Sequence, residues 1–184
     1  VRPCPSGGNP LRALVLGGSA CGKSSWAEDL ACRLGGPLIY LATMEPWGQD
    51  GAERIARHRQ ARAGKGFTTL EQPRNLETCS IPSQATVLLE DLGNLVANEV
   101  FSGKAVDKDA ALAALERGLT ALEHKAEHLV VVGNDLFRDG EDYPPETMAY
   151  LEVLSQVQTN LSKRYDLVAE LVCGIPVIWK GEMV

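Results

Sequence analysis

The sequence has little positive charge, no long apolar run and no closely paired cysteines, and each of these absences excludes a class of protein. A net charge of -6 over 184 residues argues against a general nucleic-acid binder, because such proteins need a basic surface to displace counterions. No apolar run approaches the roughly 20 residues that span a bilayer. The five cysteines include no CxxC pair, which disfavours a disulfide framework and a zinc site. We therefore expect a reduced, cytoplasmic protein with no nucleic-acid or membrane partner.

The alternation of apolar and polar segments predicts one α/β domain over residues 11–184, after a disordered tail over residues 1–10. Apolar runs typical of buried parallel strands lie at 12–16, 37–43, 85–92 and 128–134, and two closing strands are expected at 167–174 and 176–180. Helical patterns lie at 22–34, 51–63, 93–101 and 107–127, with a last helix opened by Pro144-Pro145. Segment 67–73 is either a short strand or a turn. This order indicates a mainly parallel sheet flanked by helices.

A phosphate-binding loop follows the first predicted strand. Residues Gly17-Gly18-Ser19-Ala20-Cys21-Gly22-Lys23-Ser24 match GxxxxGK[ST], with an apolar strand before them and a helical pattern after them, as the motif requires. The glycines let successive backbone N–H groups face a phosphate, and the helix N-terminus adds its dipole. Lys23 can reach the β and γ phosphates, and the Ser24 hydroxyl suits Mg²⁺. The loop predicts binding of GTP or ATP with Mg²⁺, but many reactions share it.

Two acids at the end of a later strand are candidates for the second metal contact. "TVLLED" ends in Glu90 and Asp91, and an acid at such a strand end holds the metal directly or through water. Because side chains alternate along a strand, only one of the two can point towards the phosphates. A pair of solvated acids at a strand end is the structural alternative.

A histidine among arginines is the second unusual feature. Arg54, His58 and Arg62 are spaced i, i+4 and i+8, so they share one face of the predicted helix over 51–63. Clustered cations lower the imidazole pKa and keep His58 neutral and nucleophilic near pH 7. From these residues alone, a solvated basic helix, a phosphate clamp and a nucleophile remain open.

Five segments occur in the order and spacing of one family: LVLGGSACGKSSWAE, LIYLATM, ERIARHRQAR, FTTLEQPRNL and VLLEDLGNLVANEVF. The sequence resembles the bifunctional adenosylcobinamide kinase / adenosylcobinamide-phosphate guanylyltransferases of cobalamin biosynthesis. The similarity covers residues 12–101 well and continues more faintly to the end of the chain.

That resemblance implies a P-loop NTPase fold of the RecA-like type, a homotrimer and two reactions. The enzyme first phosphorylates adenosylcobinamide with ATP or GTP. The histidine at His58 then takes GMP from GTP, and the phosphorylated corrinoid receives it, giving adenosylcobinamide-GDP. By position, the catalytic residues are His58 and Lys23, and Ser24 and Glu90 hold Mg²⁺. Besides the phosphate loop, the implied nucleotide contacts are Ala42, Thr43, Met44, Arg59, Gln60, Ala61, Arg62, Glu71 and Glu90.

The chain departs from the family pattern in places. The family usually has arginine at Ala20, and Cys and Thr where Asp91 and Gly93 stand. The segment TMAYLEVLSQVQTN, residues 147–160, has none of the expected arginines. Two alternatives therefore stand beside the bifunctional transferase. One is a small-molecule kinase without guanylylation, and the other is a degenerate nucleotide-binding sensor or partner protein.

Overall fold

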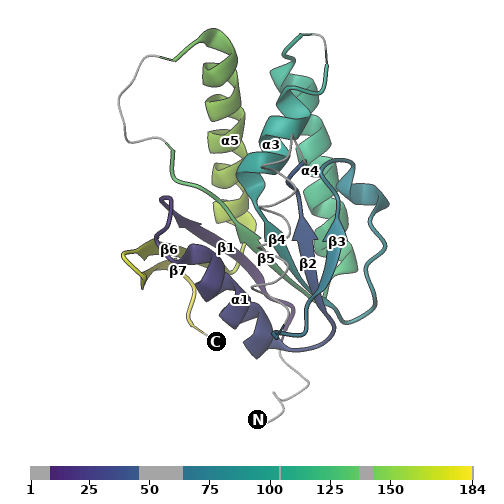
Figure 1. Ribbon diagram of the computed structural model, residues 1–184, viewed down its shortest axis with the longest axis vertical. Coiled ribbons are helices and arrows are strands. Elements are labelled where there is room, and N and C mark those ends of the chain that lie inside the picture. Colours follow the sequence, from purple (N-terminus) through teal and green to yellow (C-terminus); the bar gives the residue numbers. More distant parts are fainter. Residues whose placement is uncertain (1–8, 46–63, 104, 137–142, 184) are drawn as a thin grey trace.

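The computed structural model describes residues 9–45, 64–103, 105–136 and 143–183, and its centre is one sheet. The seven described strands are ordered β3-β2-β4-β5-β1-β6-β7 (Figure 1). Their bounds are β1 Arg12–Gly17, β2 Leu38–Ala42, β3 Thr68–Glu71, β4 Thr86–Glu90, β5 His128–Val132, β6 Leu167–Val172 and β7 Ile175–Lys180. Only β7 is antiparallel, against β6; every other pairing is parallel.

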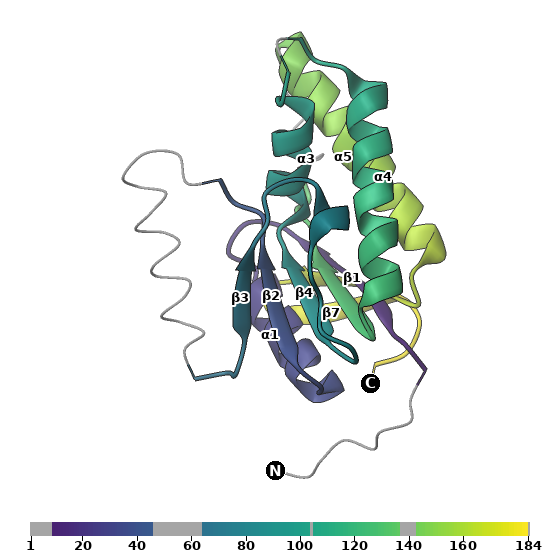
Figure 2. The same cartoon turned by 90° about the vertical axis from the view of Figure 1, so that its right-hand side faces the viewer.

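Helices cover both faces of this sheet. They are α1 Lys23–Leu34, α3 Leu92–Val100, α4 Lys108–Lys125 and α5 Pro145–Arg164, with a short 3₁₀ turn, η1, at Leu76–Thr78. The α1 helix lies on one face, and α3, α4 and α5 lie on the other and extend beyond the end of the sheet (Figures 1 and 2). No helix within the described ranges is both long and apolar enough to cross a membrane.

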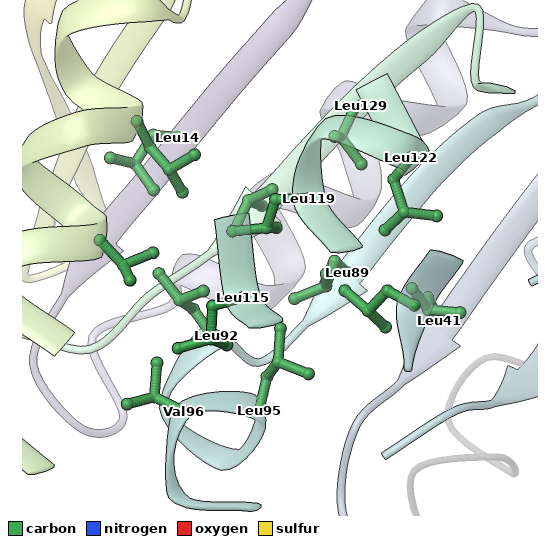
Figure 3. Close-up of a cluster of buried hydrophobic side chains, with 14 of the residues drawn as sticks. Leu14, Leu41, Leu89, Leu92, Leu95, Val96, Leu115, Leu119, Leu122 and Leu129 are labelled. Atoms are coloured by element: carbon green, nitrogen blue, oxygen red, sulfur yellow. The ribbon is translucent and has the colours of Figure 1, made fainter. Parts of the chain in front are cut away.

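The two faces of the sheet bury two apolar clusters. The larger cluster joins the sheet to α3, α4 and α5. Figure 3 shows leucine side chains of the strands, α3 and α4 packed together in this cluster, among them Leu14, Leu41, Leu89, Leu95, Leu115, Leu119 and Leu129. The smaller cluster packs Ala27, Leu30 and Ala31 of α1 against the opposite face. Burial of strands on both sides explains why they appear in the sequence as unbroken apolar runs.

The sequence expectations are confirmed for the described strands and helices. Segment 67–73, left open between strand and turn, forms β3, and the strands and helices observed elsewhere lie within a few residues of their predicted ranges. The 3₁₀ turn at η1 was not expected. The helix predicted over 51–63 lies entirely outside the described residues, as does most of the predicted tail.

Strand register places several predicted site residues at one edge. Ala42 of β2 pairs with Glu71 of β3 on one side and with Glu90 of β4 on the other. Glu90 in turn pairs with Val132 of β5, which lies beside β1. The carboxyl ends of these strands therefore meet where β1 enters the phosphate loop, the usual position of a ligand site in an open parallel sheet.

Candidate active site

The phosphate loop has the geometry that its sequence requires. It joins the end of β1 to the first residue of α1, and Gly22 takes a left-handed conformation with φ 92°, which glycine adopts at no steric cost. The Lys23 side chain is largely buried, and its Nζ donates a hydrogen bond to the Gly18 carbonyl at 3.0 Å. The lysine therefore lies along the inside of the loop, within reach of any phosphate bound there.

Ser24 and Glu90 come together across the site. The Ser24 hydroxyl donates a hydrogen bond to Oε1 of Glu90 at 2.5 Å, which joins the start of α1 to the end of β4. Asp91 turns the other way, and its Oδ1 accepts from the Asn94 backbone N–H at 2.6 Å, as the N-cap of α3. The expected alternation is confirmed: Glu90 faces the phosphate loop, and Asp91 does not.

Glu90 lies in an environment that disfavours its ionised form. Burial raises its pKa above the usual value of a carboxyl group, and the charges of Asp91 and Glu28 add to this effect, while hydrogen bonds from Ser24 and Tyr40 oppose it. Its second oxygen, Oε2, is buried and has no hydrogen-bond partner among the described residues. Buried polar atoms without partners are rare and costly. A cation beside Ser24 would provide the missing partner.

The residues after β2 and β3 complete the same edge. Thr43 is fully buried, and its hydroxyl donates to the Asp91 carbonyl at 2.7 Å. Met44 follows it and is half-buried, whereas Glu71 is exposed at the end of β3. The structure therefore brings Ala42, Thr43 and Glu71 to the edge that carries Glu90; their contact with a nucleotide, which the resemblance implies, stays a prediction.

Two supporting contacts were not foreseen from the sequence. Asn98 of α3 donates to the carbonyls of Thr43 and Pro73, at 2.8 and 3.0 Å, and so fixes the loops after β2 and β3. The Gly174 N–H, in the β6–β7 turn, donates to the Cys21 carbonyl at 2.9 Å and holds the phosphate loop from its other side. Asn98 lies within the family segment VLLEDLGNLVANEVF, but the sequence assigns no role to either residue, because each contact joins chain segments far apart in sequence.

Two of the three histidines lie in the described part of the chain. His128 accepts a hydrogen bond from the Leu11 N–H through Nδ1 at 3.0 Å, and burial lowers its pKa, so it has a structural role. His124 lies in the last turn of α4. His58, with Arg59, Gln60, Ala61 and Arg62, lies outside the described residues, and the role predicted for it stays a prediction.

Comparison with known proteins identifies the family. A family model described as cobinamide kinase / cobinamide phosphate guanyltransferase matches residues 13–178. The chain belongs to this family. The match spans the seven described strands except Arg12, the first residue of β1, and the last two residues of β7. Membership in the cobinamide kinase / cobinamide phosphate guanyltransferase family confirms the predicted class, a transferase of cobalamin biosynthesis with a phosphate-loop nucleotide site.

A characterised relative supports the family assignment, and a solved structure supports the fold. The bifunctional adenosylcobalamin biosynthesis protein CobP of Pseudomonas aeruginosa is 28% identical over 176 residues, covering 94% of this chain and 99% of that protein. An ATPase from the type III secretion system of pathogenic bacteria matches with a TM-score of 0.50 and 13% identity. This chain spans 53% of that ATPase chain, and the likeness confirms only the α/β fold.

Proposed function

We propose that this chain catalyses both reactions of its family on one nucleotide site: phosphorylation of the cobinamide hydroxyl, then transfer of GMP to the product. The observation that carries the proposal is the contact between Ser24 and Glu90 beside Lys23 at the mouth of the phosphate loop. It unites the residues needed for phosphoryl transfer, in a chain whose family performs it.

In the kinase step, the substrate alcohol attacks the γ-phosphorus of the nucleotide. A new O–P bond forms, the bond to the β–γ bridging oxygen breaks, the alcohol proton is released, and nucleoside diphosphate leaves. The backbone N–H groups of the loop and the Lys23 ammonium stabilise the negative charge on the transferring group. Lys23 exchanges its hydrogen bond to Gly18 for one to a phosphate oxygen.

Ser24 and Glu90 suit a bound Mg²⁺. The pair offers a hydroxyl and a carboxylate whose Oε2 lacks a partner among the described residues, and oxygen ligands of this kind match the preference of Mg²⁺. An ion held there would supply positive charge that neutralises the charge developing on the phosphates. Ser24 would contact the ion, and Glu90 would orient it directly or through water.

In the guanylyl-transfer step, His58 is the nucleophile. Its imidazole nitrogen attacks the α-phosphorus of GTP, an N–P bond forms, and pyrophosphate leaves. The phosphate of the phosphorylated cobinamide then attacks the same phosphorus, releasing the histidine and giving the GDP-linked product. Arg59 and Arg62 hold the phosphates, with Gln60 and Ala61 beside the nucleotide. The basic residues near His58 in sequence support this role, since a triphosphate relieves their mutual repulsion.

The proposal extends to a homotrimer with sites between subunits. Its structural support is the edge strand β7, where Ile175 and Trp179 are 67% and 68% exposed, and Val172 beside them in β6 is 47% exposed. Large apolar side chains gathered at a sheet edge favour burial against another chain.

The decisive experiment uses GTP labelled in the α-phosphate, purified protein and Mg²⁺, followed by a denaturing gel. We expect label that remains on the chain and is lost in acid, as a phosphoramidate would be. His58→Ala should abolish it, whereas His124→Ala, which removes an exposed imidazole in α4, should not. Label retained in His58→Ala would sink the mechanism.

A parallel reaction with γ-labelled nucleotide and cobinamide reports the kinase step. Phosphorylated cobinamide without a protein adduct would favour the small-molecule kinase. Binding of GTP without either product would favour the sensor.

A further inference from the structure

A second polar cluster lies beside the nucleotide site, on the α3 and α5 side of the sheet. Three side-chain atoms converge on the backbone of Gly93 in the first turn of α3. A Cβ placed on Gly93 would lie 3.1 Å from Asn134 Nδ2, 3.1 Å from the Tyr150 hydroxyl and 3.2 Å from Asp91 Oδ1. These contacts are tight, so the groups approach this closely because position 93 has no side chain.

Two members of the cluster are hydrogen-bond donors without a protein acceptor. Neither Asn134 Nδ2 nor the Tyr150 hydroxyl makes a hydrogen bond to another residue in the described ranges, although Asn134 uses its backbone carbonyl to accept from Gln158 at 2.9 Å. Asp91 Oδ1 is already used by the Asn94 N–H. Both residues are partly buried, but neither donor atom is among the buried side-chain atoms that lack a partner, so solvent reaches both.

The aromatic ring of Tyr150 is held in place by a neighbouring ring. Its ring stacks on Phe101, at the C-terminal end of α3, with centroids 6.4 Å apart and planes at 25°. Burial, with a smaller contribution from the charge of Asp91, raises the pKa of Tyr150 to about 12. The hydroxyl is therefore a proton donor throughout the neutral range.

Chain connectivity places this cluster next to the phosphate loop. Asp91 directly follows Glu90, which contacts Ser24 at 2.5 Å. Asn134 directly precedes Asp135, whose N–H donates to the Gly17 carbonyl at 3.1 Å. The cluster is thus linked through the backbone to the phosphate-loop site on two sides, at the carboxyl ends of β4 and β5, where ligands of open parallel sheets bind.

We propose that Tyr150 and Asn134 bind the substrate whose alcohol accepts the γ-phosphate. Tyr150 donates a hydrogen bond to the alcohol oxygen, and Asn134 donates one to a neighbouring oxygen of the same substrate, which leaves a lone pair on the alcohol free to attack phosphorus. This inference rests on the proposed kinase function and adds the residues that select and orient the acceptor. The two donors fix the acceptor while the new O–P bond forms and the bond to the β–γ bridging oxygen breaks; the alcohol proton passes to solvent, and the nucleoside diphosphate departs on the opposite side. The open side of Phe101, which is half-exposed, is an apolar surface for the body of the acceptor.

The test compares Tyr150→Phe and Asn134→Ala with wild-type protein in steady-state kinase assays that vary cobinamide and nucleotide separately. Loss of one neutral hydrogen bond should raise the KM for cobinamide by about 5- to 10-fold, with the KM for nucleotide unchanged. Tyr165→Phe removes a hydroxyl at the other end of α5 and should change neither constant. Gly93→Ala inserts a methyl group among the three polar atoms without weakening helix propensity, and should raise the KM for cobinamide at least as much.

The labelling reaction with α-labelled GTP requires no acceptor, and it separates the two proposals. Variants that label normally but have a raised KM for cobinamide establish the acceptor site. An unchanged KM for cobinamide in both Tyr150→Phe and Asn134→Ala, with normal labelling, overturns this inference and leaves the proposed function standing. A wild-type protein that neither labels nor phosphorylates cobinamide overturns the proposed function, and the acceptor site with it.

Discussion

Replacement of Glu90 by Gln should make the protein more stable and less active at the same time. Glu90 is largely buried, and its Oε2 has no hydrogen-bond partner in the described part of the chain. An unpaired buried polar group costs about 1–3 kcal/mol. The glutamine keeps an oxygen that accepts from Ser24 and removes the charge, but its amide N–H groups then need hydrogen-bond acceptors. We therefore expect the free energy of unfolding to increase by a net amount of about 1 kcal/mol. For a chain of this size that is about 2–4 °C in Tm.

The increase in unfolding free energy in Glu90→Gln should become larger as pH rises. Burial raises the pKa of Glu90 above its usual value of 4.5, so the folded state binds this proton more tightly than the unfolded state does. The stability that the protonated group provides is complete below the usual carboxyl pKa and is lost as pH rises through the raised folded-state pKa. Glu90→Gln has no such loss. Its advantage over wild type should be near zero in acid and reach a plateau above the raised pKa.

Thermal unfolding without nucleotide or Mg²⁺, recorded over a series of pH values, measures both effects. The same variant should lose about 10- to 100-fold in kinase activity, the usual cost of removing a group that orients a metal. A variant that is less stable than wild type at pH 8, or a stability difference that does not change with pH, would refute the reasoning about burial. A variant with full Mg²⁺-dependent activity would show that Glu90 does not orient the metal.

Three further outcomes are expected. Lys23→Met should weaken GTP binding by roughly 10- to 100-fold, since a charge-assisted hydrogen bond contributes about 1.5–3 kcal/mol; calorimetric titration measures this, and unchanged affinity would contradict it. Gly35→Ala should lower the free energy of unfolding by about 1–3 kcal/mol from its backbone conformation alone, because φ 77° with ψ -158° is a region that essentially only glycine occupies. Gly36→Ala should lower it more in urea unfolding, because its φ is also positive and its Cβ would collide with the Gln84 carbonyl. Ile175→Asp should shift light-scattering mass towards the monomer, and an unchanged mass would exclude β7 as the interface.

Much of the architecture could be predicted from the sequence because parallel strands buried on both faces must be continuously apolar. The runs that form β1, β4 and β5 each have at most one polar residue before the strand end. The short segment of β3 was ambiguous because only four residues are involved and none is fully buried. Its pairing with β2 decides the matter, and pairing depends on a partner about 30 residues away in sequence.

The nucleotide half of the site was more predictable than its surroundings for a related reason. The phosphate loop is local in sequence: the eight residues from Gly17 to Ser24 include the glycines that let the backbone turn, the N–H donors and the side chains expected to bind phosphate and metal. Alternation along β4 also predicted that one acid faces the phosphates, but a pattern cannot decide between Glu90 and Asp91 without knowing which face α1 covers. Asn98 was missed altogether, because its two acceptors are carbonyls of loops that follow different strands.

The acceptor side shows how departures from a family pattern can be interpreted once the fold is known. Asp91 and Gly93 replace the residues usual in the family, and Tyr150 lies in a helix that has lost the family's arginines. In sequence these are separate departures from the family pattern, and each alone suggests loss of function. In space they meet: the absence of a side chain at Gly93 is what allows Tyr150 and Asn134 to approach within about 3 Å of one point. Random loss of function would not be expected to gather two unpaired donors beside an intact phosphate loop. The convergence instead favours a chain that keeps its nucleotide chemistry and has rebuilt the contacts to its acceptor.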